Sequence, residues 1–262
     1  MQTIESNLSV DFDFIELFPL SDLHVGDALS DSKLFYDFVQ FILAEPYRYL
    51  MGLGDLINNN LKHSAGSTYE DIMSPGQQKK EIVRFLMPVR DRLLGMVGGN
   101  HEGRTKKEVD LDITEEVADK LGVPFREEEA LWVIRFGNRR PSDKTKVRPY
   151  VYTVYGTHGS WGGKRPGSAI NNAEDLSRGM LCDVYVAGHA HKRIGHRATI
   201  RIPDTRNGKV TEMEQLYVCA SSWLKYGGYG ARKSYRPQVR GTAPVVLGRG
   251  PGQDQKEMYA VI

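Results

Sequence analysis

Five short apolar runs, each followed by a polar turn, constrain the fold of this chain more than any other feature of its sequence. The runs cover residues 14–20, 49–53, 93–97, 150–155 and 184–187, and their turns cover 21–24, 54–55, 98–101, 156–158 and 188–191. Short apolar runs bounded by glycine and polar residues are typical of buried strands. Every one of these turns carries an aspartate or a histidine, so polar chemistry recurs at the end of each expected strand.

Segments with apolar residues at helical spacing separate several of the expected strands. They cover residues 32–43, 77–94 and 113–121. Strands that alternate with helices predict a layered α/β architecture. After residue 190 the pattern becomes richer in strands, which we expect at 197–202, 215–220 and 257–262.

Chain length and the distribution of glycine and proline bear on domain organisation. A chain of 262 residues suits one large domain, and we expect a single domain over residues 1–262. The segment at about 226–255 is rich in glycine and contains three prolines, which predicts a loop-rich stretch. Pro19 lies inside the first apolar run, and because proline cannot donate to a sheet ladder we expect it near the strand's end or at a bulge.

Composition says more about where the protein resides than about what it does. Hydrophobic residues make up 40% of the chain and charged residues 26%, as in soluble globular proteins. Two cysteines do not make a disulfide framework, and neither a signal peptide nor an apolar run of about 20 residues is visible. We therefore expect a cytoplasmic protein that does not engage a membrane.

The net charge of +2 is too small to indicate nucleic-acid binding by itself. Basic residues do gather late in the chain, at Arg232, Lys233, Arg236 and Arg240. A solvated surface loop explains such a cluster, and so does a platform for phosphates.

The polar turns carry residues that bind metal ions. In open α/β sheets, ligands sit beyond the carboxyl ends of the strands, which is where these turns lie. That rule places on one rim of the sheet Asp22, His24, Asp55, Asn100, His101, His158, His189 and His191. Carboxylates, imidazoles and an amide oxygen suit divalent ions such as Mn²⁺, Fe²⁺ and Zn²⁺. About seven ligands are too many for one ion with an open position and suit a pair of ions.

The ordered motifs resemble those of the calcineurin-like metallophosphoesterases. The resemblance spans residues 13 to about 200 and rests on Asp22-Leu23-His24, Gly54-Asp55, Gly99-Asn100-His101-Glu102, His158 and Gly188-His189-Ala190-His191. It implies a layered β-sandwich flanked by helices, with a dinuclear metal site at the carboxyl ends of the strands. It further implies a hydrolase in which a hydroxide that bridges the two ions attacks a phosphoester.

The resemblance also implies roles for the individual residues. One ion would be held by Asp22, His24 and His191, the other by Asn100, His158 and His189, and Asp55 would bridge them. His101 would contact the substrate phosphate and protonate the leaving oxygen, and Glu102 would orient His101. We expect Mn²⁺ first, with Fe, Zn, Ni and Mg as alternatives.

Each motif alone has an ordinary interpretation. Asp22 suits a helix N-cap, Asp55 and Asn100 suit turns, and His189 and His191 can flank a strand without any metal. Five such motifs in this order, each after an expected strand, favour the metal site.

The substrate is less constrained by the sequence than the site. The leading hypothesis is a phosphodiesterase or nuclease that acts on nucleic acid or a nucleotide, from the late basic residues, the short opening motif and the aromatic residues Trp161, Trp223 and Tyr226. A phosphomonoesterase such as a phosphoprotein phosphatase is one alternative, and a non-catalytic binding module that keeps the fold is another. Candidate substrate contacts are Asn58, Lys164 and Arg165. A polar turn at 58–60 explains Asn58 equally well, and a flexible surface turn at 162–165 explains the two cations more simply than a phosphate site does.

Overall fold

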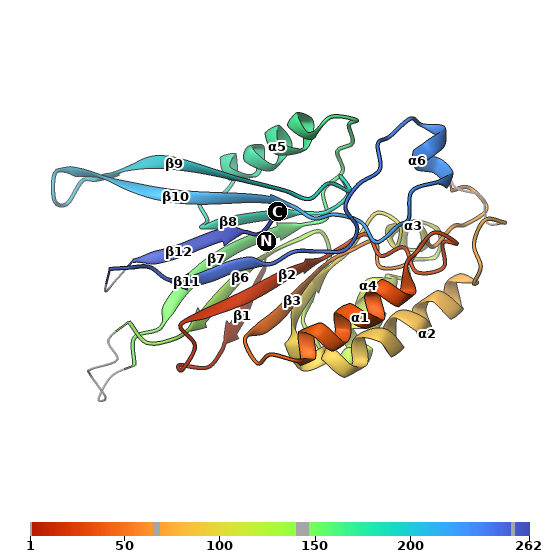
Figure 1. The fold of residues 1–262 in the computed structure, drawn as a ribbon, viewed down its shortest axis with the longest axis horizontal. Coiled ribbons are helices and arrows are strands. Elements are labelled where there is room, and N and C mark those ends of the chain that lie inside the picture. Colours follow the sequence, from red (N-terminus) through yellow and green to blue (C-terminus); the bar gives the residue numbers. More distant parts are fainter. Residues whose placement is uncertain (1, 65–68, 140–146, 253–254) are drawn as a thin grey trace.

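The five apolar runs all form strands, and these strands belong to two stacked sheets. The computed structural model describes residues 2–64, 69–139, 147–252 and 255–262. The strands are β1 (Gln2–Asn7), β2 (Phe14–Leu20), β3 (Arg48–Leu53), β4 (Leu93–Val97), β5 (Phe125–Arg126), β6 (Glu129–Phe136), β7 (Tyr150–Thr157), β8 (Val184–Ala187), β9 (Ile194–Asp204), β10 (Lys209–Cys219), β11 (Val245–Arg249) and β12 (Lys256–Ala260). The expected layered α/β sandwich is confirmed (Figure 1).

Within the described residues each sheet has six strands, and the strands that lead into the polar turns run parallel within it. One sheet has the order β12-β11-β2-β3-β4-β5, in which β2, β3, β4 and β5 are parallel. The other has the order β1-β6-β7-β8-β10-β9, in which β7, β8 and β10 are parallel. The carboxyl ends of parallel neighbours meet at one edge, so the turns of each sheet are brought together.

The main core lies between the sheets. Trp132, Ile134 and Phe136 alternate with less buried residues along β6 and face Leu17 and Met51 of the other sheet. This alternation is what a strand produces when one of its faces is buried, because successive side chains point to opposite sides.

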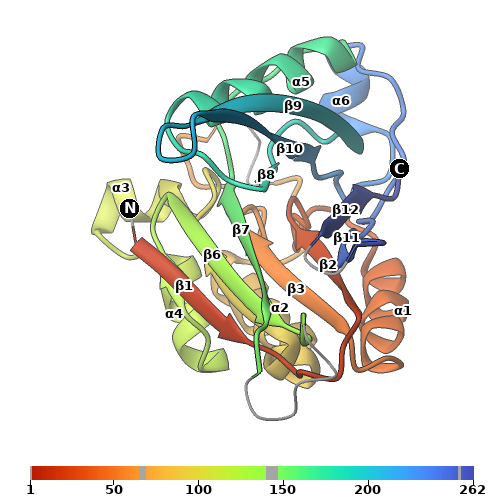
Figure 2. The ribbon, with the colours of Figure 1, turned by 90° about the vertical axis from the view of Figure 1, so that its left-hand side faces the viewer.

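Helices cover the outer faces of both sheets (Figures 1 and 2). They are α1 (Ser32–Leu43), α2 (Pro75–Leu86), α3 (Gly103–Val109), α4 (Ile113–Leu121), α5 (Pro166–Asp175) and α6 (Gly228–Arg232), with 3₁₀ turns η1 (Met87–Arg92) and η2 (Leu176–Arg178). The apolar sides of α1, α2 and α4 pack on Phe18 and Leu50 of the first sheet, and α5 packs on Tyr185 and Tyr217 of the second. In the described part of the chain, no helix has the length and apolar character of a membrane span.

Several elements differ from the sequence-based expectations. The helix expected over 77–94 ends at Leu86, and the chain continues through η1, which contains Pro88, into β4. Proline has no N–H for the helical ladder and its ring crowds the preceding turn, so it stops the helix there. The sequence pattern also missed β1, β6 and α5, and within the segment 226–255 it missed the short helix α6 and the strand β11.

Pro19 lies where the first sheet tolerates it. Strand β11 pairs with β2 only from Phe14 to Leu17, so Pro19 faces β3 alone, next to the last residue of the strand. The expectation that it sits near the strand's end is confirmed, and the missing N–H costs no ladder bond on the β11 side.

Candidate metal centre

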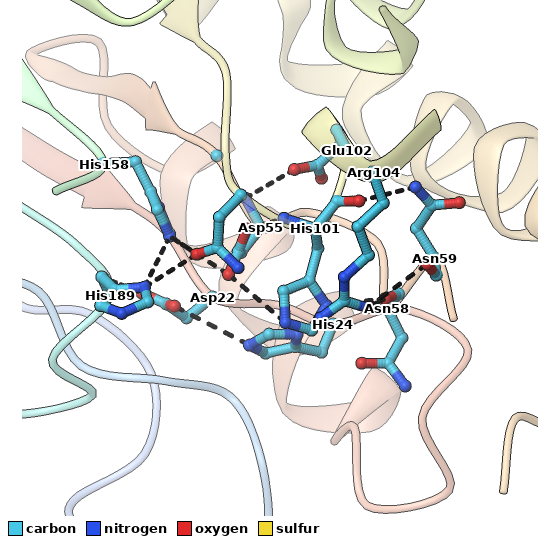
Figure 3. A network of polar contacts seen from close by, with 12 residues as sticks. Asp22, His24, Asp55, Asn58, Asn59, His101, Glu102, Arg104, His158 and His189 are labelled. Atoms are coloured by element: carbon cyan, nitrogen blue, oxygen red, sulfur yellow. Dashed lines mark hydrogen bonds and ion pairs between the residues drawn. The ribbon is translucent and has the colours of Figure 1, made fainter. Parts of the chain in front are cut away.

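The polar turns of both sheets meet at one edge of the sandwich. Asp22 and His24 follow β2, Asp55 follows β3, and Asn100 and His101 follow β4. His158 follows β7, and His189 and His191 follow β8 of the other sheet. The short distances between their donor atoms bring all eight side chains to a single centre, and Figure 3 labels Asp22, His24, Asp55, His101, His158 and His189 there.

The backbone at this centre adopts conformations that ordinary residues avoid. Within the described residues, eight non-glycine residues have positive φ, and five of them are expected ligands: Asp22, His24, Asp55, His189 and His191. Positive φ costs an L-residue roughly 1–3 kcal/mol and persists where the surrounding structure dictates it, which is characteristic of functional sites. Hydrogen bonds between the turns impose it here, including Asp22 N–H to Gly54 O (3.1 Å) and His24 N–H to Asp55 O (3.1 Å).

Asp22, His24 and His191 form one group of donor atoms. Asp22 Oδ1 lies 2.9 Å from His191 Nε2 and 3.8 Å from His24 Nε2, and the two Nε2 atoms are 3.3 Å apart. The other carboxylate oxygen, Oδ2, accepts hydrogen bonds from Ser21 Oγ (2.7 Å) and His189 N–H (3.0 Å). Oδ1 itself is buried, and among the described residues its polar contacts are these imidazoles alone, so a cation between it and the rings would satisfy both.

Asp55, Asn100, His158 and His189 form a second group. Asn100 Oδ1 lies 2.9 Å from His158 Nε2 and 2.8 Å from His189 Nδ1. Asp55 Oδ2 lies 3.1 Å from His158 Nε2 and 3.8 Å from His101 Nε2. Asp55 therefore stands between this group and the set of His24 and His101, whose ring centroids are 4.5 Å apart.

Backbone carbonyls orient two of the histidines. His158 Nδ1 lies 2.7 Å from Leu53 O, and His101 Nδ1 lies 2.6 Å from Asn58 O. A carbonyl only accepts, so in each ring Nδ1 carries the hydrogen and Nε2 is turned toward the centre. Such contacts behind a histidine are what a metal or proton-transfer site requires to hold the ring.

The hydrogen bonds of the Glu102 carboxylate go to the turn after β3 and not to His101, so no contact among the described residues supports its expected role of orienting that ring. Its buried carboxylate accepts hydrogen bonds from the N–H groups of Asp55 (3.0 Å), Leu56 (2.7 Å) and Ile57 (3.0 Å). Successive side chains of a helical turn point in different directions, so Glu102, at the start of α3, faces the turn after β3 while His101 faces the centre. Glu102 holds the backbone that carries Asp55.

The carboxylates and imidazoles shift each other's protonation. Burial alone would raise the pKa of Asp22 and Asp55, but neighbouring histidines hold both well below the usual range. Burial likewise disfavours charged imidazoles, yet Asp55 raises the pKa of His158 to about 10 and Asp22 raises that of His191. Burial, and after it the charge of Asp55, raises the pKa of Glu102 to about 7. The centre thus favours anionic aspartates beside cations, which suits a site built for positive charge.

Of the three candidate substrate contacts, Asn58 lies beside the centre, whereas Lys164 and Arg165 lie on the exposed turn before α5. The Asn58 side chain donates to Asp71 Oδ1 (2.7 Å), so only its backbone carbonyl faces His101. Lys164 and Arg165 are exposed just before α5, and in the described part of the chain neither makes a hydrogen bond or ion pair with the centre. Their role in substrate binding stays a prediction.

Sequence reasoning missed Arg104. It lies on the first turn of α3, and its Nη1 donates to Asn58 O (3.0 Å), Asn59 O (3.3 Å) and Asn60 Oδ1 (3.0 Å) beside His101 (Figure 3). The signal available was its spacing, because residues three apart share one face of a helix.

The two-layered sandwich carries its donor residues at the carboxyl ends of the strands, as expected from the resemblance of its motifs to those of the calcineurin-like metallophosphoesterases. No established family profile matches the sequence, and no curated protein matches it either. Among solved structures, the chain is similar to a nuclease MPE of Pseudomonas putida, with 11% identity over 93% of this chain and 87% of that chain and a TM-score of 0.35. It is also similar to a metallophosphoesterase of Sphaerobacter thermophilus, with 14% identity over 95% of this chain and 89% of that chain and a TM-score of 0.39. A Vps29 double mutant of Entamoeba histolytica is similar as well, with 13% identity over 95% of this chain and 100% of that chain and a TM-score of 0.42. Likeness at this level carries no argument about activity.

Proposed function

We propose that this protein is a metal-dependent hydrolase that cleaves phosphodiester bonds of nucleic acid or nucleotides. The observation that supports it most is the position of Asp55 between two groups of donor atoms, with His101 Nε2 turned toward the same carboxylate. A shared carboxylate suits a pair of ions, and an imidazole beside it suits proton transfer to a leaving oxygen.

The donor set fits two divalent ions. We assign one ion to Asp22, His24 and His191 and the other to Asn100, His158 and His189, with Asp55 shared, as the buried Asp22 Oδ1 and the grouped donor atoms support. Mn²⁺ is our first assignment, and Fe, Zn, Ni and Mg suit the same ligands. When bound, such ions polarise a phosphoryl oxygen and lower the pKa of a water molecule.

The chain's own residues supply orientation and a proton. The hydrogen bond to Asn58 O keeps a hydrogen on Nδ1 of His101. Its Nε2 then delivers a proton to the leaving oxygen. Burial lowers the pKa of His101 to about 3, so the ring by itself is neutral near pH 7. A phosphate anion bound beside the ring favours its protonated form, because an adjacent opposite charge raises the pKa of an imidazole.

The choice of a diester substrate rests on the surface around the late basic residues. Tyr226 is 54% exposed and Arg236 is also exposed, so both are free of the core. Two of the other cations are partly neutralised, since Arg232 pairs with Glu70 (3.3 Å) and Arg240 pairs with Asp31. Trp161 and Trp223 pack against apolar neighbours, which leaves Tyr226 as the aromatic candidate for stacking a base.

We also propose a cytoplasmic location.

The test is metal-restored hydrolysis of a diester. The protein is stripped with a chelator, and turnover of bis-(p-nitrophenyl) phosphate and p-nitrophenyl phosphate is compared with Mn²⁺, Ni²⁺, Zn²⁺ or Mg²⁺ added back. Faster hydrolysis of the diester supports the proposal. A clear preference for the monoester indicates a phosphomonoesterase, and no turnover from folded, metal-loaded protein indicates a binding module.

A further inference from the structure

The turn at 58–60 is tied to the first turn of α3 from both sides. Arg104 donates through Nη1 to three oxygen atoms of Asn58, Asn59 and Asn60. In the opposite direction, Asn59 Nδ2 donates to His101 O (2.6 Å) and to Thr105 Oγ1 (2.9 Å). The two segments are therefore joined by reciprocal hydrogen bonds around His101.

Two donors share the carbonyl oxygen of Asn58. His101 Nδ1 lies 2.6 Å from it and Arg104 Nη1 lies 3.0 Å from it. A carbonyl oxygen has two lone pairs, so these two donors saturate it. Figure 3 shows the Arg104 side chain running alongside His101 toward this carbonyl. Whatever fixes the position of this oxygen also fixes which His101 nitrogen carries a hydrogen and where Nε2 points.

The backbone next to the Asn58 carbonyl is held elsewhere too, since the Asn58 N–H donates to Val25 O (3.0 Å). The Asn58 side chain is directed to Asp71, and the Asn59 backbone is at φ 45° with its N–H bonded to Gln78 Oε1 (2.8 Å). These contacts anchor the turn away from the shared oxygen, whereas Arg104 joins His101 directly at that oxygen.

Arg104 is also an unusual cation for such a place. It is partly buried, burial lowers its pKa, and in the described part of the chain it forms no ion pair with a carboxylate. A guanidinium can direct several N–H groups in one plane at neighbouring oxygens, which a lysine ammonium cannot reproduce. The charges of Asp55, Glu102 and Asp71 partly offset the burial, so the guanidinium stays a cation while its hydrogen bonds go to neutral oxygens of the asparagine turn.

We propose that Arg104 is a positioning residue for His101, which it holds through their shared acceptor, the Asn58 carbonyl, so that Nδ1 keeps its hydrogen and Nε2 faces the reacting phosphoester. The inference rests on the proposed function, because it takes His101 as the proton donor. It assigns the asparagine turn to the support of catalysis rather than to direct substrate contact.

Kinetics of a double-mutant cycle test the inference. Arg104→Gln should lower kcat by roughly tenfold or more while leaving KM and metal content close to wild type, and Arg104→Lys should recover part of the loss. The loss should be larger for a diester with an alkyl leaving group than for the p-nitrophenyl ester, since a good leaving group needs little protonation. In a His101→Ala background, Arg104→Gln should cause no further loss. Lys107→Gln, which removes an exposed charge from the same helix, is the matched control.

A direct readout of the ring separates this inference from the proposed function. ¹⁵N NMR of the metal-free protein at mildly alkaline pH should show His101 as the Nδ1–H tautomer in wild type and a mixture of tautomers in Arg104→Gln or Arg104→Lys. Loss of kcat that persists in the His101→Ala background would mean that Arg104 binds substrate directly, and it would overturn the inference. An unchanged tautomer in folded variants would overturn it as well. If wild type hydrolyses no phosphoester, the proposed function fails while the tautomer still decides the inference.

Discussion

Two turns that lead into the centre are built in opposite ways. The turn after β3, at 54–60, is almost fully buried, and its N–H groups bond to Glu102, Gln78 and neighbouring carbonyls. The turn after β7, at 159–165, is mostly exposed and is fastened by few contacts, among them Lys192 Nζ to Gly163 O (2.6 Å). The first turn carries Asp55 and the carbonyl that accepts from His101, so the more tightly hydrogen-bonded turn is the one that holds the reacting groups. The second is free to vary, as loops that select ligands commonly are.

The largest effect should come from the buried turn. Asp55→Asn removes the charge that both groups of donors share, so metal content should fall at both positions and turnover should drop by more than the ~10–100-fold typical of residues that only orient a ligand. Elemental analysis and the diester assay measure the two quantities. Asp37→Asn, which breaks the exposed pair with Lys33, is the control and should change neither. Full metal content in Asp55→Asn would contradict its bridging role.

His101→Ala should separate chemistry from metal binding. Because its Nε2 faces Asp55 from 3.8 Å while Nδ1 is tied to Asn58, we expect intact metal content and a kcat lower by ~10²–10⁴-fold. Metal analysis and single-turnover kinetics test this. An emptied metal site would show that His101 is a ligand instead.

Metal affinity should rise steeply with pH. In the metal-free protein, the carboxylates raise the pKa values of His158, to about 10, and of His191, so both rings hold protons near neutrality. Each must lose a proton before it can bind a cation, so affinity should gain up to ~10-fold per pH unit for each ring as the pH rises toward these values. Calorimetry in buffers of different ionisation enthalpy counts the released protons. A pH-independent affinity would contradict the assignment of these two rings as ligands.

A matched pair of glycine substitutions compares the two turns directly. A Cβ at Gly54, where φ is 77°, would lie 2.4 Å from the Gly99 backbone, whereas a Cβ at Gly162 meets nothing within 4 Å. Gly54→Ala should therefore destabilise the protein by more than about 3 kcal/mol, and Gly162→Ala should change the free energy of unfolding by less than about 1 kcal/mol. Denaturant unfolding of the two variants measures both. Equal stability would refute the contrast.

The smallest effect is expected at the exposed turn. Replacing Lys164 and Arg165 by glutamine should leave the free energy of unfolding within about 0.5 kcal/mol of wild type. If the two cations contact substrate, KM for a nucleic-acid substrate rises while kcat stays unchanged, and Lys209→Gln on the distant β9–β10 hairpin leaves both unchanged. Identical KM values in steady-state assays would remove these residues from the substrate contacts.

The sequence by itself determined the layered fold and the identity of the donor residues. Both follow from local patterns: apolar runs that end in glycine predict strands, and the residue after each run is visible without knowing what it touches. The sequence pattern missed strand β11, because a five-residue run after a proline, inside a glycine-rich stretch, is too short a signal. The position of this strand also depends on its pairing with β2, which is distant in the sequence.

Only the tertiary structure decided which groups act on one another. Glu102 accepts hydrogen bonds from three N–H groups that lie 45 to 47 positions earlier in the chain. Arg104 donates to the Asn58 carbonyl, which lies 46 positions earlier. His189, from the other sheet, donates its N–H to Asp22 across 167 positions. Such partners are set by how two sheets stack and how their turns pack, and these long-range contacts leave no periodic trace in the chain. For that reason the sequence could name His101, while its acceptor and the arginine beside it emerged from the fold.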